Sequence, residues 1–167
     1  FWKKLEDNNH IYLDYYEGWY SVSDETFYQE NELIKKEDGK FYAPSGSVVE
    51  WLKEESYFFK LSKWQDKLLD YYTKEPERIA PKHIYNEIVS FIKSGLKDLS
   101  ISRSTVKWGI PVPGNSSHTC YVWFEALINY CSILGYPDEQ NHLFRKFWSN
   151  SFHIIGKDIR RHHMIIW

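Results

Sequence analysis

One stretch of ten residues, from Tyr121 to Tyr130, limits the possible folds of this chain more than any other. Read as a helix, it places Trp123, Ala126, Leu127 and Tyr130 at positions i, i+3, i+4 and i+7, which lie on one face. The small Ala126 between two large rings leaves room for a narrow apolar slot. Such a slot suits a thin, unbranched side chain, and a thioether sulfur gains from aromatic neighbours. The pattern alone more often marks a helix packed in a core.

A second motif is typical of a nucleotide site. The apolar run Phe152–Ile155 predicts a buried strand, Gly156 a turn, and Asp158 the start of a helix that runs to Trp167. In an open α/β sheet, ligands bind where strands end and helices begin. Gly156 lets a ligand approach the backbone. The carboxylate of Asp158 can accept hydrogen bonds from ribose hydroxyls, or it simply caps the helix.

Two charged or titratable side chains are further candidates. His163 shares a helix face with Ile159 and Trp167, and a histidine among apolar residues is more often a core residue than a ligand. Arg103 ends an alternating stretch that predicts a strand over 98–104. It is either a solvated charge or a fixed positive charge that orders a carboxylate beside a phosphate.

Motifs in a fixed order resemble the catalytic domain of a bacterial-type methionyl-tRNA synthetase, a class I aminoacyl-tRNA synthetase. The resemblance covers essentially the whole chain. It is carried by Tyr16–Tyr20, Glu55–Phe59, Asp98–Arg103, Trp108–Pro113, Tyr121–Leu127 and Ile155–Ile159.

The resemblance implies a fold class and a set of site residues. The fold would be α/β, part of a Rossmann-like nucleotide-binding domain with a mostly β connective insert. Arg103 would be catalytic, and Gly156 and Asp158 would contact the adenosine of ATP. The methionine pocket would be formed by Trp123, Ala126, Leu127, Tyr130, Ile159, His163 and Trp167.

The predicted domain organisation follows the same order. Residues 1–10 end the first half of the catalytic domain, 11–60 form the β-rich insert, 61–97 a helical return segment, and 98–167 the second half. Locally, Asp38–Gly39 predicts a hairpin, and Ser62 with Gln65 a capping box. Further predictions are helices over 82–94, 122–134 and 138–148, and a loop over 111–116.

The sequence of the insert indicates that it holds no metal ion. Many relatives carry Cys-x-x-Cys knuckles there, but the corresponding stretches read Ser21–Asp24 and Ala43–Gly46, without a thiol. Hydroxyl and carboxylate groups do not make a structural zinc site, so we expect the zinc-free form. ATP, with Mg²⁺, is expected as a substrate.

Charge and cysteine content limit the partners. The net charge of −2 gives no global basic field for nucleic acid, so contact with the acceptor end of tRNA(Met) is expected through Lys53, Lys60 and Lys63. Cys120 and Cys131 are too few for a disulfide scaffold, which favours a reducing cytoplasm. We expect a cytoplasmic monomer without a membrane segment.

The resemblance predicts a methionine–tRNA ligase that activates methionine with ATP and transfers it to tRNA(Met). The family's phosphate-binding signatures, of His-Ile-Gly-His and Lys-Met-Ser-Lys-Ser type, are absent, so we expect a piece of a longer protein that is inactive alone. The family usually has Asp at the position of Glu125, and apolar residues at those of Arg160 and His162. One alternative is a class I synthetase for another apolar amino acid. Another is an aromatic-rich module for sugars or single-stranded nucleic acid, which would expose its rings.

Overall fold

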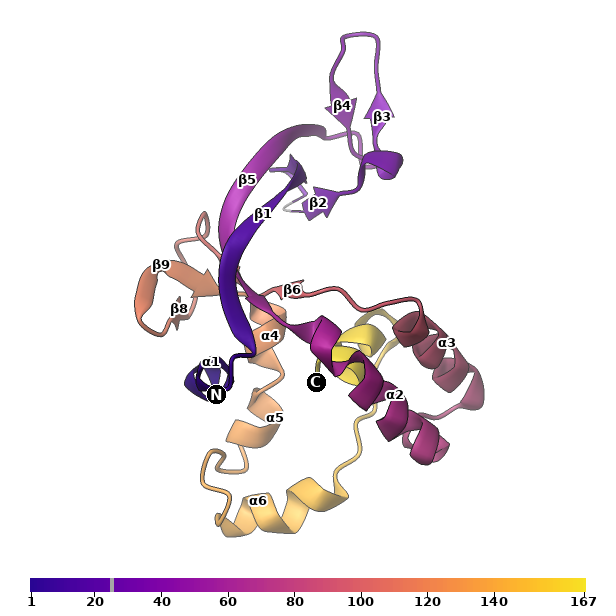
Figure 1. Ribbon diagram of the computed structural model, residues 1–167, viewed down its shortest axis with the longest axis vertical. Coiled ribbons are helices and arrows are strands. Elements are labelled where there is room, and N and C mark those ends of the chain that lie inside the picture. Colours follow the sequence, from indigo (N-terminus) through magenta and orange to yellow (C-terminus); the bar gives the residue numbers. More distant parts are fainter. Residues whose placement is uncertain (25) are drawn as a thin grey trace. The chain divides into compact units, whose positions relative to one another are not determined.

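The computed structural model describes residues 1–24 and 26–167, and these form two compact units (Figure 1). Unit 1 comprises Phe1–Tyr12 and Tyr57–Trp167, and unit 2 comprises Leu13–Ser56. The chain passes into unit 2 along strand β1 (Ile11–Ser21) and returns along β5 (Val48–Phe59). No helix within the described ranges combines the length and apolar character that crossing a membrane requires.

Unit 2 is mostly β-structure. Its strand order is β2-β1-β5-β4-β3, where β2 is Thr26–Tyr28, β3 is Ile34–Lys35 and β4 is Phe41–Tyr42; a 3₁₀ turn, η1 (Glu30–Glu32), precedes β3. The turn between β3 and β4 contains Gly39 at φ +79°, a conformation that favours glycine. Asp38 fixes this turn by accepting hydrogen bonds from the amide of Lys40 at 3.0 Å and the hydroxyl of Tyr42 at 2.7 Å. The predicted hairpin is confirmed.

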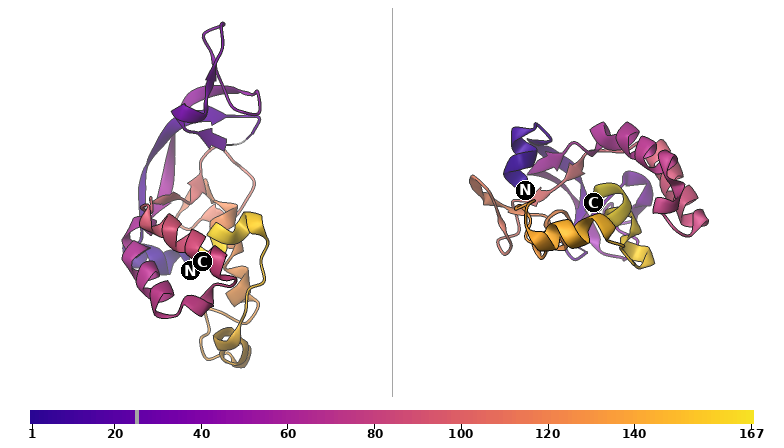
Figure 2. Two further views of the ribbon diagram at one scale, coloured as in Figure 1. Left: turned by 90° about the vertical axis from the view of Figure 1, so that its right-hand side faces the viewer. Right: turned by 90° about the horizontal axis from the view of Figure 1, so that it is seen from below.

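Unit 1 is built around a helical pair that follows β5. The 3₁₀ turn η2 (Leu61–Trp64) leads into α2 (Gln65–Lys74); α3 (Lys82–Lys93) follows after η3 (Pro76–Arg78), and the two helices lie side by side (Figure 2). The helix predicted over 82–94 is confirmed, and it buries Ile88, Val89 and Ile92. The core also receives the ring of Trp2 from α1 (Trp2–Asp7).

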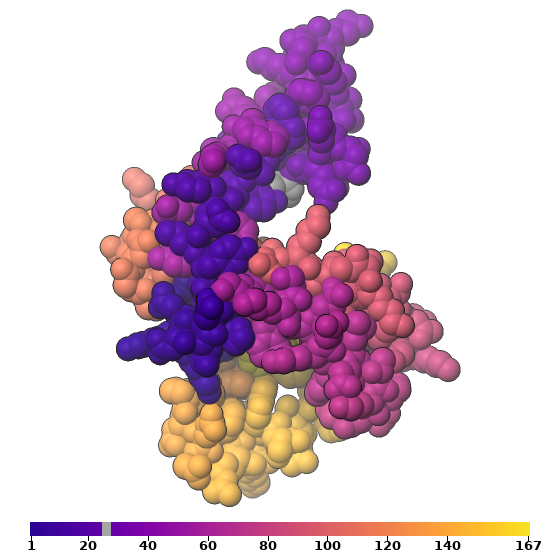
Figure 3. All heavy atoms as spheres, viewed as in Figure 1, coloured from indigo at the N-terminus to yellow at the C-terminus, as the bar shows by residue number. Residues whose placement is uncertain are grey.

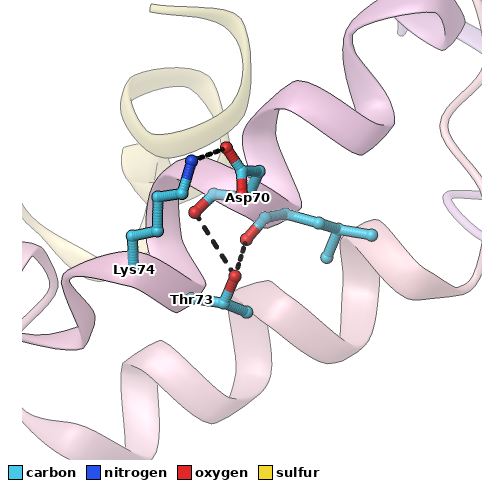
Figure 4. A network of polar contacts seen from close by, with 4 residues as sticks. Asp70, Thr73 and Lys74 are labelled. Carbon is cyan, nitrogen blue, oxygen red and sulfur yellow. Dashed lines mark hydrogen bonds and ion pairs between the residues drawn. The ribbon is translucent and has the colours of Figure 1, made fainter.

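Helix α2 has one buried side and one solvated side. On the buried side, the hydroxyl of Tyr72 donates a hydrogen bond of 2.6 Å to the carbonyl of Met164, which lies in the last helical turns of the chain. On the solvated side, Lys74 pairs with Asp70 at 2.6 Å, and the Thr73 hydroxyl donates to the carbonyl of Leu69 (Figure 4). This division is typical of an amphipathic surface helix.

The predicted capping box at the start of α2 is wrong. The hydroxyl of Ser62 donates to the carboxylate of Asp98 at 2.6 Å, and the side chain of Gln65 accepts from the amide of Leu96 at 2.7 Å. Both side chains therefore bind the 96–98 segment, because that segment offers them partners that a local cap does not. Helix α2 begins only at Gln65, after the 3₁₀ turn.

Four short strands, β6 to β9, form the β-structure of unit 1 that follows α3. Strand β6 (Leu99–Ser100) pairs with the end of β5, and an antiparallel sheet has the order β7-β9-β8, with β7 at Ser102–Arg103, β8 at Pro111–Val112 and β9 at Asn115–Cys120. The loop predicted over 111–116 is instead a hairpin between β8 and β9. Its turn contains Gly114 at φ +82°, and turns of this kind join antiparallel strands directly.

The central helix is interrupted, which corrects the prediction of one helix to Leu134. It consists of α4 (Val122–Ala126) and α5 (Asn129–Ser132). Between them the amide of Ile128 bonds to the carbonyl of Glu125 at 3.2 Å, and the amide of Tyr130 to that of Leu127 at 3.3 Å. Hydrogen bonds three residues apart define a 3₁₀ turn, so the chain winds more tightly at this point.

The C-terminal segment differs from prediction in two places. Helix α6 (His142–Phe147) begins later than expected, where the Asn141 side chain accepts from the Leu143 amide, and it is followed by η4 (Trp148–Asn150). The buried strand predicted at Phe152–Ile155 is absent, and Phe152 and Ile154 are 93% and 100% exposed. No described strand pairs with this segment, and an extended segment needs such a partner to form a strand.

The last helical turns are irregular. They comprise η5 (Lys157–Ile159), a short α-helical step, and the π-helical η6 (His162–Ile166). Side chains of η6 contribute to the core, and η6 packs against α3. The chain is therefore helical over most of the range predicted for the last helix, although its hydrogen bonding is not that of one regular α-helix.

Candidate functional site

Tyr130 and His163 form the centre of the candidate site. The Tyr130 hydroxyl, from α5, lies 2.9 Å from Nε2 of His163 in η6, and Nδ1 of the same ring lies 2.9 Å from the carbonyl of Ile159. A carbonyl only accepts, so Nδ1 carries the proton and donates it. In the neutral imidazole, Nε2 then accepts from the Tyr130 hydroxyl. His163 is 9% exposed. Its two hydrogen bonds, one at each ring nitrogen, hold the ring in one orientation.

Further rings surround Tyr130. The ring of His153 meets it edge-on with centroids 4.6 Å apart, and the ring of Trp167 lies at 5.9 Å. Trp148 contacts both neighbours, with its centroid 6.3 Å from that of His153 and 5.7 Å from that of Trp167. Trp167 and His163 were predicted for this site, whereas His153 and Trp148 were not. The clustering of three histidines between 153 and 163 was the signal available in the sequence.

The pocket residues predicted at and just after α4 differ in their contacts and in their exposure. Trp123 stacks on His162, with centroids 4.6 Å apart and planes inclined by 27°. Burial lowers the pKa of His162, and the neighbouring His163 lowers it further, which favours the neutral ring. Leu127 is buried, whereas Ala126 is exposed. The structure thus brings Tyr130, Ile159, His163 and Trp167 together and places Trp123 on the residue preceding His163.

A cavity of about 340 Å³, open to solvent, adjoins this cluster. The residues that line it belong to the segments from α5 to the end of the chain, which are coloured orange to yellow in Figure 3. Of the predicted pocket residues, only Tyr130 is in its wall. The wall consists of Tyr130, Leu134, Phe147, Trp148, Ser151, Phe152, His153, Ile154 and Ile155.

Gly156 and Asp158 stand at the start of η5, and both are exposed. A Cβ atom at Gly156 would meet nothing within 4 Å, so the space above this backbone is open. The carboxylate of Asp158 makes no hydrogen bond to any residue in the described ranges. Both groups are therefore available to a ligand approaching the turn.

Arg103 is held in place by its neighbours. Its guanidinium donates to the hydroxyl of Ser100 at 2.8 Å and to the carbonyl of Ser102 at 2.7 Å, and it lies 4.6 Å from the ring centroid of Tyr121. These contacts fix the charge next to the start of α4. A fixed charge stabilises an anion better than a mobile one, since it needs no reorganisation.

In unit 2, the two stretches predicted to lack zinc are joined by hydrogen bonds. The carboxylate of Asp24 accepts from the hydroxyls of Ser45, Ser47 and Tyr28, the last two at 3.1 and 3.0 Å. These bonds, above all that from Ser45, hold the pKa of Asp24 below its ordinary value. Within residues 1–24 and 26–167, no group of three or more His, Cys, Asp or Glu side chains is arranged to hold a metal ion.

The lysines predicted for RNA contact already have neighbours. Lys53 lies 3.8 Å from the carboxylate of Glu17, and Lys60 donates to the side chain of Asn9 at 2.6 Å. Residues 13–56 carry four lysines against eleven acidic side chains, a net charge of −7. Unit 2 therefore repels polyanions on average.

Comparison with known proteins gives consistent matches over the full chain. The family model described as "tRNA synthetases class I (M)" matches residues 1–167. The chain is 58% identical over 167 residues to the methionine–tRNA ligase of Rickettsia prowazekii, covering 100% of this chain and 32% of that protein. It is 54% identical over 166 residues to that of Brucella suis biovar 1, covering 99% and 32%.

Solved structures agree with the sequence matches. Mycobacterium tuberculosis methionyl-tRNA synthetase bound by methionyl-adenylate has a TM-score of 0.85 and 46% identity, over 99% of this chain and 33% of that one. The free form of the same enzyme gives the same TM-score and identity. The chain spans about a third of the length of these relatives.

Proposed function

The chain belongs to the class I tRNA synthetases of the methionyl type, and on this premise we propose that it forms part of a methionine–tRNA ligase. Its α/β fold is that of a segment of the Rossmann-like catalytic domain of this family. The full-length protein would join the carboxylate of methionine to the α-phosphate of ATP, release pyrophosphate, and pass the methionyl group to tRNA(Met). Catalysis would consist mainly of positioning and electrostatic stabilisation.

One observation supports this proposal: the rings of Tyr130, His163 and Trp167 and the backbone carbonyl of Ile159 meet in a partly exposed cluster, although Tyr130 comes from α5 and the other three residues from the end of the chain. Aromatic edges and faces suit the polarizable thioether of methionine. His163 would contact the substrate side chain without transferring protons, because Nδ1 is committed to the carbonyl of Ile159. Trp123, Ala126 and Leu127 would complete the pocket.

The nucleotide would bind beside the turn at Gly156. Open space above Gly156, and a carboxylate of Asp158 that makes no hydrogen bond to a described residue, suit an adenosine whose ribose hydroxyls donate to that carboxylate. Arg103 would order the side of the site where the methionine carboxylate meets the phosphate. ATP would bring Mg²⁺ with it. Neither phosphate-binding signature of the family occurs in this chain, so the proposal concerns the full-length protein.

Three further proposals concern the insert and the cellular setting. The hydrogen bonds of Asp24 would join the two stretches of the insert that relatives join through zinc. Lys63 is the best candidate for contact with the acceptor end of tRNA(Met), because Lys53 lies in the acidic unit. The enzyme would act as a monomer in the cytoplasm, where translation takes place.

The test is ATP–pyrophosphate exchange by the full-length protein with each of the amino acids in turn. Exchange that depends on methionine, and is at least about 100-fold weaker with leucine or isoleucine, is expected, since a pocket discriminates shape by a few kcal/mol. Exchange with another apolar amino acid but not methionine would support the rival synthetase. No exchange with any amino acid would overturn the proposal.

A further inference from the structure

We propose that Trp148 and His153 are positioning residues for the methionine pocket, because they hold the rings of Tyr130 and Trp167 in place. This inference rests on the proposed function, and it adds two residues that contact the rings of Tyr130 and Trp167 and also line the adjoining cavity. Neither residue is placed in contact with methionine itself.

The four rings form a closed circuit of contacts. His153 meets Tyr130 at 4.6 Å and Trp148 at 6.3 Å, both edge-on, and Trp148 meets Trp167 edge-on at 5.7 Å. Trp167 returns to Tyr130 at 5.9 Å, which closes the circuit. Edge-to-face packing is the arrangement that aromatic quadrupoles favour, and it restricts the orientation of both partners. Each pocket ring is thus packed against a ring outside the predicted pocket.

Tyr130 needs such support because little else holds it. Its side chain is 37% exposed, and α5 is only four residues long, with a 3₁₀ turn directly before it. The hydroxyl bond to His163 fixes the far end of the side chain, whereas the contact with His153 fixes the plane of the ring. Loss of the second contact would leave only the rings of Trp167 and His163 to hold the plane of the Tyr130 ring.

The charge state of His153 matters for this role. Burial lowers the pKa of His153, and the neighbouring His163 lowers it further. The titratable groups that face His153 are His163 from η6, with ring centroids 6.2 Å apart, and Tyr130 from α5. A neutral His153 packs against Tyr130, whereas a protonated one would be drawn toward water and away from His163. Acid should therefore loosen the pocket through His153.

The experiment uses the full-length protein and measures ATP–pyrophosphate exchange with methionine and with ATP as the varied substrate. His153→Ala and Trp148→Ala should each raise the KM for methionine about tenfold, the size expected for loss of an aromatic pair, with the KM for ATP within about twofold. His153→Phe keeps a ring that cannot be protonated. It should restore the KM for methionine at neutral pH and abolish the rise in that KM on acidification.

His83→Ala is the matched control, because His83 is exposed on α3. If the wild-type protein exchanges with methionine but His153→Ala and Trp148→Ala leave its KM unchanged, the inference fails and the proposed function stands. A wild-type protein without methionine-dependent exchange overturns the proposed function first. Should the alanine variants not fold, as judged by circular dichroism, His153→Phe decides: a methionine KM that follows pH as in the wild type overturns the positioning role.

Discussion

Tyr130 reaches from the central helix so that its hydroxyl lies 2.9 Å from Nε2 of His163, a ring that is itself held through Nδ1 by Ile159. This hydrogen bond joins Tyr130, which lines the proposed pocket, to the buried side chain of His163. Tyr130→Phe removes only the hydroxyl. The full-length protein should then bind methionine about two- to tenfold more weakly, the cost of one hydrogen bond, as measured by tryptophan fluorescence titration.

The matched control for this change is Tyr136→Phe. Tyr136 follows α5 closely, and its hydroxyl makes no hydrogen bond to any described residue, so its loss should leave methionine affinity unchanged. Equal methionine affinity in Tyr130→Phe and the wild type would contradict a role for the Tyr130–His163 bond in the pocket.

Tyr72 supplies a prediction about stability. Burial raises its pKa to about 12, and its hydroxyl donates to the carbonyl of Met164. Tyr72→Phe should lower the free energy of unfolding by about 1 kcal/mol, since the carbonyl of Met164 loses its hydrogen-bond donor. Tyr71→Phe, which alters a half-exposed ring on the same helix, is the control and should cost less.

The raised pKa of Tyr72 also sets a pH dependence. Its ordinary value is near 10, so the unfolded chain loses this proton first as the pH rises. The stabilisation is complete below about pH 10 and is lost as the pH rises from there toward about 12. Urea unfolding at pH 8 and at pH 11 should therefore show a larger loss in the wild type than in Tyr72→Phe. Equal losses would contradict the burial of an un-ionised phenol.

Asp24 should stabilise unit 2 in a manner that depends on acid. Its pKa is lowered in the folded protein, mainly by the hydroxyl of Ser45, so its contribution is present above the ordinary carboxyl range and is lost as the pH falls through the lowered value. Asp24→Asn should lower the midpoint of urea unfolding at pH 7 and flatten the decline toward low pH. Asp14→Asn, at an exposed position on β1, should do neither; a similar effect from both changes would contradict the cluster.

Charge reversal of the lysines should separate the two units in tRNA binding. Lys63→Glu should weaken binding of tRNA(Met) to the full-length protein and reduce the salt slope by about one, the change expected for one lost phosphate contact. Lys53→Glu should have a smaller effect, because Lys53 already lies 3.8 Å from Glu17 in a unit of net charge −7. The measurement is the dissociation constant at several salt concentrations, and a larger effect at Lys53 would contradict the assignment.

The sequence predicted those parts of the fold that depend on local chemistry. The hairpin at Gly39 follows from a φ value that glycine favours, and helix α3 follows from helical periodicity. The strand predicted at Phe152–Ile155 is absent, because a strand forms only with a neighbour to pair with, and the local sequence does not show whether that neighbour is there. The capping box predicted at Ser62 is wrong for a related reason: the Ser62 hydroxyl bonds to Asp98, 36 residues away, and does not cap its own helix.

The candidate site divides along the same line. Family motifs brought Tyr130, His163 and Trp167 into one predicted pocket, and the structure places these three rings in contact. The roles of His153 and Trp148 were missed, although His153 lies in the Phe152–Ile155 motif, because those roles depend on the path of the chain after α6. Trp123 was predicted to share a face with Tyr130, and the interruption between α4 and α5 is why it contacts His162 instead.

That interruption has a geometric consequence. A 3₁₀ turn advances about 120° per residue against about 100° in an α-helix, so the two residues between α4 and α5 add about 40° between the directions of the side chains on either side. Trp123 and Tyr130 flank the turn and diverge by that added rotation. The two rings therefore contact two consecutive histidines: Trp123 stacks on His162, and the hydroxyl of Tyr130 bonds to His163.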